Sequence, residues 1–438
     1  MARHNKVPQV AKATGKRRVL EIGKDLLIAA LTCSAVFLAL QTPMASQVRG
    51  WVTPPAPTSQ PVAQQRSEAL MPYGIAARNS LGLYGASYDQ ALVGQVFEQL
   101  SPYLGEALAT AGAPEKMTRR QWQALLDAPG FYCVFQGTPP LAAFSTWLGD
   151  GEALTGKAQS LLLAWDGSGV WLAWRDGSDF YRAQTQVDYE GHLAAALEGF
   201  SPNGAAFAYA LARTDETYGT LDPDVLVLIT APQPQVYTAA SPDFVGDGEA
   251  LEQLLKALGF QSGVGSAYEA GGDLAINESG DRLRVSSGGT VTFRAGEDAR
   301  YPVASAGSRP RLEEAALQSW DLLNQAAAPW KGETVFVLTG AEETAGGWII
   351  TFHGRLNGVP LLTGREGWCA SFTVTGQAIT DFTLTLRTYT SSGVTSLVPG
   401  ERLAAAARRA LPGNGRRLTL CYSDSGGPTL TAGWVSED

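Results

Sequence analysis

Two adjacent pairs of glutamates, Glu313-Glu314 and Glu342-Glu343, are the residues whose types best suit acid–base chemistry. A glycoside hydrolase needs one carboxyl group to protonate the leaving oxygen and a second to act as nucleophile or base at the same bond. Neighbouring residues on a helix or a strand point apart, so neither pair can face one substrate in this way. We therefore expect both pairs to lie on solvated surface.

Histidine is too sparse for a metal centre of a familiar kind. The chain has only His4, His192 and His353, and no His-Glu-x-x-His or Cys-x-x-Cys pattern occurs. Zinc sites need several such ligands at compatible spacing. Glycine-rich loops of the dinucleotide-binding or P-loop type are also absent from the sequence. The sequence thus predicts no metal and no cofactor.

The hexapeptide from Ser423 to Pro428, Ser-Asp-Ser-Gly-Gly-Pro, resembles the segment around the nucleophile of chymotrypsin-like proteases. That chemistry needs a histidine base and a buried aspartate beside the serine. Neither His192 nor His353 lies in the Ala-Ala-His-Cys setting of those enzymes, and little chain follows Ser425 to build their specificity pocket. We predict a hairpin turn here and no catalytic residue.

Four large aromatic side chains, Trp165, Trp171, Trp174 and Phe180, fall within one predicted meander. Such a cluster could line a glycan-binding groove. Alternating aromatics in strands more often fill a core, and we favour that interpretation.

Three cysteines, Cys133, Cys369 and Cys421, follow the one in the first apolar run. An odd number at wide spacing is not a disulfide framework, although one bridge between Cys369 and Cys421 is possible. Buried thiols are the interpretation that we favour.

The first apolar run, Leu26 to Leu40, decides on which side of a membrane the rest of the chain lies. Extended to Ala45, it approaches the roughly 20 residues that a bilayer helix needs. Seven basic residues precede it against two acidic ones, which favours a cytoplasmic N-terminus. A cleaved signal peptide is the alternative, but cleavage after Ala45 would place Pro43 at the −3 position. We predict a cytoplasmic tail over 1–25 and a single transmembrane anchor over 26–45.

Small residues recur four positions apart within this anchor, Ala29 with Cys33 and Ala30 with Ser34. Such spacing lets a second helix approach closely in the bilayer, so these four residues are candidates for helix packing.

The chain after the anchor is long, apolar and acidic. The whole chain of 438 residues is 45% hydrophobic, which is enough to fill the cores of two or three domains. Without the basic tail it keeps 26 of 33 basic and 40 of 42 acidic residues, a charge of −14. Such a surface does not favour binding to nucleic acid or to anionic lipid.

Hydrophobic periodicity predicts an α+β fold of antiparallel sheets and packed helices outside the membrane. A Pro/Gln-rich spacer over 46–70 leads to an N-terminal α+β domain over 71–240. A middle helix with a β-meander over 241–305 and a C-terminal α+β domain over 306–438 follow. Among the clearest elements are a helix near 88–111, a capping box from Thr118 to Gln121, and strands at 160–165, 170–174 and 179–185.

Several stretches together resemble the YycH family and its YycI relatives. These are Gly130 to Pro140 (GFYCVFQGTPP), Phe244 to Phe260 (FVGDGEALEQLLKALGF), Asp281 to Phe293 (DRLRVSSGGTVTF) and Phe352 to Leu361 (FHGRLNGVPL). That family consists of membrane-anchored regulators of the WalK sensor histidine kinase in Gram-positive bacteria.

The resemblance implies a non-enzymatic regulator that adjusts signalling in cell-wall metabolism. Its transmembrane helix and outer domains would contact a WalK-like kinase and a YycI-like sister protein, and no catalytic residue is transferred. The alternative is an extracytoplasmic glycan-binding module or hydrolase of the cell wall. A buried pair of carboxylates in a cleft would favour that alternative.

Overall fold

Antiparallel sheets with helices packed on them make up the described part of the computed structural model, residues 67–437 except 83, 150–153, 262–264, 266, 308 and 414. This confirms the predicted α+β class. The described residues belong to one compact unit of the chain. The predicted tail and anchor, with Ala29, Ala30, Cys33 and Ser34, lie outside the described residues, as does most of the spacer. Across residues 67–437 as described, no helix is both long and apolar enough to cross a membrane.

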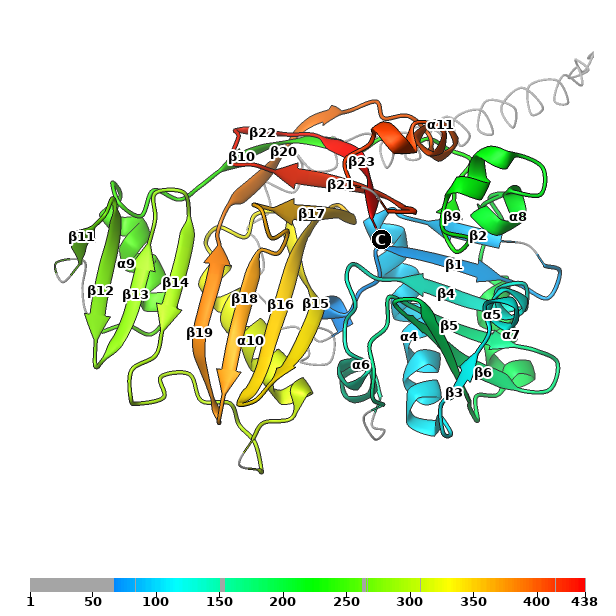
Figure 1. Cartoon of the computed structure of the whole chain (residues 1–438), viewed down its shortest axis with the longest axis horizontal. Helices are drawn as coiled ribbons and strands as arrows, with labels where there is room; N and C mark the ends of the chain where they lie inside the picture. The colour runs from blue at the N-terminus through cyan, green and yellow to red at the C-terminus, as the bar shows by residue number, and fades with distance from the viewer. Residues whose placement is uncertain are drawn as a thin grey trace, which may run out of the picture. The chain divides into compact units, whose positions relative to one another are not determined.

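A seven-stranded antiparallel sheet forms the first part of this unit, in the order β2-β1-β4-β5-β6-β7-β3 (Figure 1). Its central strands are apolar on both faces because helices cover both sides. Helices α4 (Gln90–Thr110) and α6 (Leu141–Trp147) bury one face, and α5 (Arg119–Leu126) with a later loop buries the other. The strands are β1 (Gly74–Arg78), β2 (Tyr84–Ser87), β3 (Glu115–Met117), β4 (Gly130–Val134), β5 (Ser160–Trp165), β6 (Val170–Asp176) and β7 (Asp179–Gln184).

A helix followed by a four-stranded antiparallel meander occurs twice in the second part. Helix α9 (Gly248–Ala257) precedes the first meander, and α10 (Leu312–Ala327) precedes the second, which has β17 inserted. The strands are β11 (Tyr268–Ala270), β12 (Asp273–Glu278), β13 (Asp281–Val285) and β14 (Thr290–Arg294), then β15 (Thr334–Thr344), β16 (Gly347–Leu356), β17 (Val359–Thr363), β18 (Ala370–Thr375) and β19 (Ala378–Thr385).

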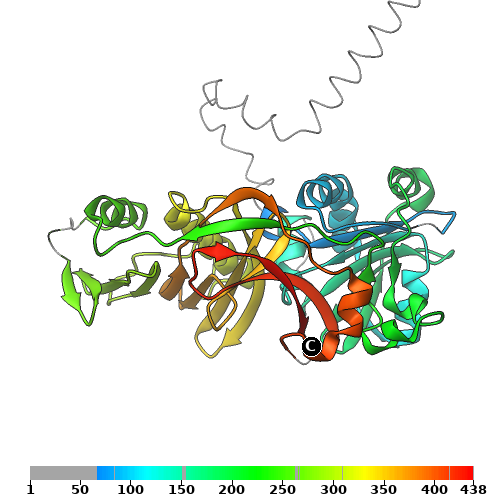
Figure 2. The ribbon, with the colours of Figure 1, turned by 90° about the horizontal axis from the view of Figure 1, so that it is seen from above.

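The last strands of the two meanders, β14 and β19, pair antiparallel, with Thr292 opposite Thr383. This antiparallel pairing of equivalent strands relates the two helix-and-meander motifs by an approximate twofold axis. One sheet of eleven strands results, and α9 and α10 lie on the same side of it (Figure 2). Buried and exposed residues alternate along β13, and the exposed ones, Arg282 and Arg284, lie on the other side of the sheet. That face of the sheet is therefore solvated.

The end of the chain returns to the first sheet. Strand β21 (Arg417–Asp424) pairs in parallel with β17 and antiparallel with β23 (Ala432–Glu437). Strands β10 (Gln235–Ala240), β20 (Thr388–Thr395) and β22 (Thr429–Leu430) form a separate three-stranded sheet. The short strands β8 (Ala206–Phe207) and β9 (Leu226–Val227), helix α8 (Ala208–Leu211) and helix α11 (Glu401–Ala406) complete this region, together with α7 (Ala194–Glu198) on the first part.

Arg355 joins the two parts from the end of β16. Its guanidinium group donates to the Met71 carbonyl oxygen at 2.7 Å, and its side chain is buried without a carboxylate partner among the described residues. Burial lowers the pKa of Arg355 to about 9.

Candidate functional site

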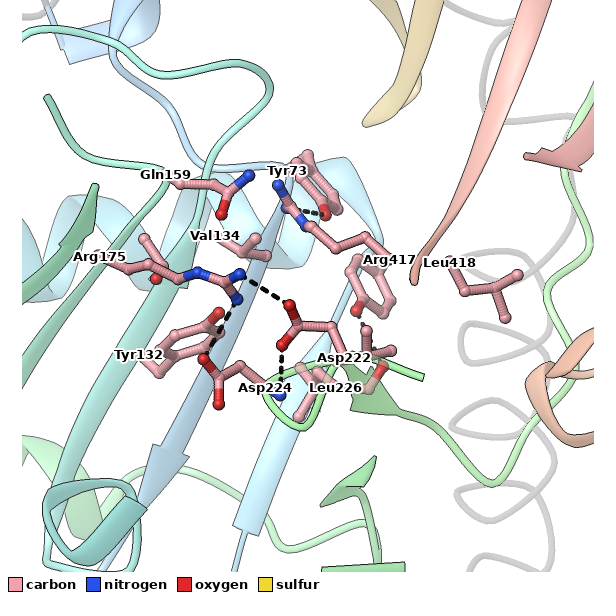
Figure 3. A pocket seen from close by; sticks show the side chains of 13 residues that line it. Tyr73, Tyr132, Val134, Gln159, Arg175, Asp222, Asp224, Leu226, Arg417 and Leu418 are labelled. Atoms are coloured by element: carbon pink, nitrogen blue, oxygen red, sulfur yellow. Dashed lines mark hydrogen bonds and ion pairs between the residues drawn. The ribbon is translucent and has the colours of Figure 1, made fainter. Parts of the chain in front are cut away.

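A polar pocket lies where β21 reaches the first sheet, and its volume of about 390 Å³ includes space that is open to solvent (Figure 3). Strands β4, β5 and β6 supply Tyr132, Ser160 and Arg175, while the loop before β9 supplies two aspartates. Strand β21 supplies Arg417. The remaining lining residues are Tyr73, Tyr88, Val134, Gln159, Asp222, Asp224, Val225, Leu226 and Leu418.

Arg175 holds both aspartates at the floor of this pocket. Its Nη2 lies 2.7 Å from Asp222 Oδ2, and its Nη1 lies 3.3 Å from Asp224 Oδ2. The Asp222 side chain also accepts from the Asp224 backbone N–H at 3.2 Å, which fixes the loop as an Asx turn. Arg119 is a more distant partner, 4.0 Å from Asp222.

The environments of the two carboxyl groups differ. Burial would raise the pKa of Asp222, but the hydrogen bond and charge of Arg175 outweigh burial and hold it below its usual value. Burial and the neighbouring Asp222 charge raise the pKa of Asp224 to about 6. Asp222 is thus the carboxylate that neutralises Arg175, and Asp224 is close to taking up a proton.

Three buried polar atoms that line the pocket have no hydrogen-bond partner: Asp224 Oδ1, Gln159 Oε1 and Ser160 Oγ. The Trp122 indole N–H acts on Asp224 and the Tyr132 hydroxyl acts on Ser160 as hydrogen-bonding groups, although neither contact has good geometry. Buried polar atoms are costly when unpaired, and Gln159 Oε1 has no hydrogen-bond partner among the described residues.

Arg417 faces the same space from the opposite side. Its Nη2 donates to the Tyr73 hydroxyl at 3.4 Å, and within the described residues it makes no ion pair shorter than 4.0 Å. Burial would lower the pKa of Arg417, but the nearby Tyr73, Tyr132 and Glu437 raise it, so the side chain is cationic.

An apolar pocket of about 520 Å³ adjoins the polar one. The two share Tyr73, Tyr88, Leu226 and Leu418 as lining residues. Burial raises the pKa of Glu401 in this second pocket to about 6, and its Oε2 has no hydrogen-bond partner. The other lining residues are Leu228, Pro232, Gly358, Val359, Pro360, Thr419, Leu420 and Trp434.

The protease-like hexapeptide lies in the connection between the paired strands β21 and β23, with Ser423 and Asp424 still in β21, and it does not assemble a triad among the described residues. Ser425 and His353 line one open groove, but His353 Nδ1 lies 2.6 Å from the Thr339 hydroxyl. Asp424 accepts from Tyr389 at 2.5 Å and pairs with Arg387 at 2.8 Å. Burial lowers the pKa of His353 to about 4, so its ring is neutral at pH 7.

The glutamate pairs differ from the prediction at one position. Glu342 and Glu343 are exposed, but Glu313 is buried, so the expectation of a solvated pair is wrong there. Glu313 lies in the first turn of α10, where Arg311 approaches it at 3.1 Å and allows it to be buried.

The cysteines and aromatics are mainly core residues. Cys133, Cys369 and Cys421 are free and buried, so Cys369 and Cys421 are not bridged. Trp174 is buried in the core and Trp165 stacks on Tyr189 with ring centroids 4.3 Å apart. In the part of the chain that is described, no group of three ligands is placed to hold a metal ion.

Sequence reasoning missed the polar pocket. Arg175 follows directly on the apolar run Val-Trp-Leu-Ala-Trp within β6, and a buried charged residue in such a strand signals a buried partner. Asp222 and Asp224, which flank a proline 47 and 49 residues later, could not be assigned to it from spacing alone.

This combination defines a class only broadly, an α+β protein with a polar pocket between two sheets. No protein-family model, no curated protein and no solved structure matches the chain.

Proposed function

We propose that this protein is a non-enzymatic, membrane-anchored regulator of a two-component sensor histidine kinase, similar to the YycH family. The anchor predicted over 26–45 would place the described unit outside the cell. Its outer unit and transmembrane helix would contact the kinase and a sister protein in cell-wall signalling.

The observation that carries this proposal is how the buried ionisable side chains are used. Arg175 is bound between Asp222 and Asp224, and Asp424 is bound by Arg387. Charged groups held by one another stabilise a single conformation, whereas a catalytic acid and base must be directed at a substrate. These two clusters thus serve to hold one conformation.

A wall hydrolase is the second candidate, because the pocket does bury two carboxyl groups with different pKa shifts. A glycosidase uses such a pair as acid and base. Here, however, Arg175 contacts both carboxylates, where a hydrolase would need the substrate and water. We therefore prefer the regulatory function.

The test is reconstitution of the full-length protein with the co-purifying sensor kinase in lipid vesicles. We expect the kinase to be recovered from native membranes with the protein, and its autophosphorylation rate to change when the protein is present. A matched version with Leu26 to Leu40 replaced by an unrelated anchor should lose part of both effects, because its helix-packing residues are gone.

Two results would count against this function. One is the absence of any kinase in the purified material together with an unchanged autophosphorylation rate. The other is release of fragments from purified cell wall by the wild-type protein but not by the Asp224→Asn variant, which would establish the hydrolase instead.

A further inference from the structure

Helix α11 and the 3₁₀ turn after it present one side to solvent at the outside of the described unit (Figure 1). The other side is buried, because Ala404 and Ala405 belong to a core cluster with Leu418 and Trp434. The exposed side carries apolar residues at helical spacing with arginines beside them. We call it the α11 face, and its residues are Leu397, Arg402, Leu403, Ala406, Ala407, Arg409 and Ala410.

Two large apolar side chains of the α11 face are strongly exposed. Leu397 is 91% exposed and Leu403 is 64% exposed. Leu397 comes shortly before Gly400, the N-cap residue of α11, so both leucines lie near the first turn of the helix. A single exposed leucine is ordinary, but leucines beside an alanine stripe form an apolar patch, and such patches mark interaction sites.

The charge around this patch is opposite to that of the protein as a whole. Between Ser396 and Arg416 the chain has four arginines and one glutamate, a net charge of +3. The glutamate, Glu401, is buried and lines the apolar pocket, so it does not reach the exposed side. Arg402 and Arg409 are exposed. The acidic overall charge disfavours anionic partners, but this segment is a local exception.

Neighbouring carboxylates do not reverse the positive charge. Asp215 pairs with Arg402 at 2.7 Å, yet 69% of the Arg402 side chain stays accessible. Glu216, next to Asp215, is exposed, and so is Arg213 just before it. Five arginines on these two segments thus accompany three carboxylates, one of which is the buried Glu401.

An anionic lipid surface complements both parts of the α11 face. Helices that rest on a bilayer place leucines in the boundary between headgroups and acyl chains, and they carry arginines or lysines on the polar side. An arginine can keep its hydrocarbon stem with the apolar residues while its guanidinium group reaches a phosphate. Anionic headgroups also attract each basic side chain that comes near the membrane surface.

The chain enters the described unit close to this face. Tyr73 and Glu401 line the same pocket, so the start of the described unit lies near the first turn of α11. The Pro-rich spacer before Ser67 spans about 65 Å at most, at about 3.1 Å per residue. The anchor predicted over 26–45 would therefore hold the α11 face within reach of the bilayer, at a high effective concentration.

We propose that the α11 face docks on anionic lipid beside the anchor. Leu397 and Leu403 enter the headgroup boundary, and Arg402 and Arg409 contact lipid phosphates. This inference goes beyond the proposed regulation of a kinase and uses only the predicted anchor.

Quenching by labelled lipids in vesicles that hold the full-length protein tests the docking. A fluorophore is attached to Ala407→Cys in a Cys33→Ala background, since Cys133, Cys369 and Cys421 are buried. The vesicles contain phosphatidylcholine alone or with phosphatidylglycerol, and some lipids carry a nitroxide quencher on the headgroup. We expect strong quenching with phosphatidylglycerol and weaker quenching without it, because only the former lipid is anionic.

The control label is placed far from the α11 face on the same protein. Tyr268→Cys lies on β11, the edge strand at the other end of the eleven-stranded sheet, and the Tyr268 side chain is 48% exposed. Its fluorophore should stay unquenched with either lipid composition.

Paired arginine substitutions measure the contribution of charge. Arg402→Gln with Arg409→Gln should lower the ratio of docked to undocked protein about 30-fold, because each arginine near an anionic surface contributes about fivefold. The matched control is Arg282→Gln with Arg294→Gln on the solvated sheet face. It removes the same charge and a similar exposed ion pair, Arg294 with Asp381 at 3.1 Å, and should leave the ratio nearly unchanged.

An apolar substitution measures the other part of the face. Leu397→Ser should also lower the ratio of docked to undocked protein, because less apolar surface is then buried in the bilayer. The Leu397 side chain is 91% exposed, so this change should leave the fold intact.

Results with the unsubstituted α11 arginines and leucines can overturn the proposal. Equal quenching of the labels at positions 407 and 268 would show that this face does not dock. Equal quenching at position 407 with and without phosphatidylglycerol would show that anionic lipid is not recognised. Protection of the 407 label from soluble iodide without quenching by lipid would assign the face to a second copy of the protein. None of these results involves a kinase, so failure of the docking and failure of the proposed regulation can be distinguished.

Discussion

Replacement of Arg175 by methionine should strongly destabilise the protein at neutral pH. Methionine keeps an unbranched hydrocarbon chain but removes both ion pairs and the guanidinium group, which lies 5.7 Å from the centroid of the Phe180 ring. Asp222 and Asp224 would then be buried beside one another without the cation that contacts both. Breaking a buried pair from one side costs about 3–5 kcal/mol.

The structure places the expected value near the lower end of that range. Arg119 stays 4.0 Å from Asp222 and compensates part of its charge. Asp224, whose pKa is already raised to about 6, can bind a proton and so limits the penalty. We expect a loss of about 3 kcal/mol in the free energy of unfolding at pH 7.

The assay is urea unfolding of the full-length protein in mild detergent, followed by tryptophan fluorescence and circular dichroism. The matched control is Arg284→Met, which removes an ion pair of the same 2.7 Å length to Asp273. Half of the Arg284 side chain is exposed, so this loss should be below about 1 kcal/mol. The penalty for Arg175→Met should also shrink at pH 4.5, where Asp224 takes up a proton. Equal losses of unfolding free energy for the two variants would refute the reasoning that burial makes the ion pairs of Arg175 more stabilising than an exposed pair.

Three further results are expected. The pKa of Asp224 is about 6 in the folded state and 3.8 ordinarily, so between these values the folded state binds more protons than the unfolded state. This residue therefore makes the free energy of unfolding fall as the pH rises from 3.8 to about 6. Asp224→Asn should remove that part of the pH dependence of urea unfolding, and an unchanged pH profile would count against this explanation. Gly137→Ala should lower the free energy of unfolding by about 1–3 kcal/mol, because φ is +69° and a Cβ would lie 2.4 Å from the Thr339 carbonyl oxygen. The control Gly177→Ala should lower it less, because φ there is +59° but the space around the Cβ is open. A larger loss for Gly177→Ala than for Gly137→Ala would contradict this. Cys369 and Cys421 should react with a thiol reagent only after unfolding, since both are free and buried; mass spectrometry of a non-reduced digest that showed them linked would disprove this.

Local elements were the part of the fold that sequence could predict. The Thr118 capping box is present, with the Thr118 Oγ1 accepting from the Gln121 N–H at 3.3 Å and the Gln121 Oε1 accepting from the Thr118 N–H at 2.8 Å. Its signal is contained within four residues. The helix predicted near 88–111 is α4, and the strands predicted at 160–165, 170–174 and 179–185 are β5, β6 and β7.

The bounds and pairing of α11, β10 and β20 were predicted less well, because contacts between distant parts of the chain determine them. The pattern of apolar residues from Glu401 to Leu411 predicts one helix over this whole range, but α11 ends at Ala406 and a 3₁₀ turn over Arg408–Ala410 follows. Strands β10 and β20 are paired although Thr238 and its partner Thr390 are 152 residues apart, a separation over which periodicity carries no information.

The polar pocket could not be predicted for the same reason. Arg175 meets Asp222 across 47 residues, and Arg417 meets Tyr73 across 344. Each side chain alone is an ordinary charged or aromatic residue, and only the sheet order brings them to one place.

The contact between Arg417 and Tyr73 also bears on the order of folding during synthesis. All strands of the first sheet end at or before Gln184, yet the pocket stays open on one side until β21, more than 230 residues later, has been made. A partly synthesised chain can therefore have the sheet but not the completed pocket. The closed pocket is thus a mark of a fully synthesised and folded unit.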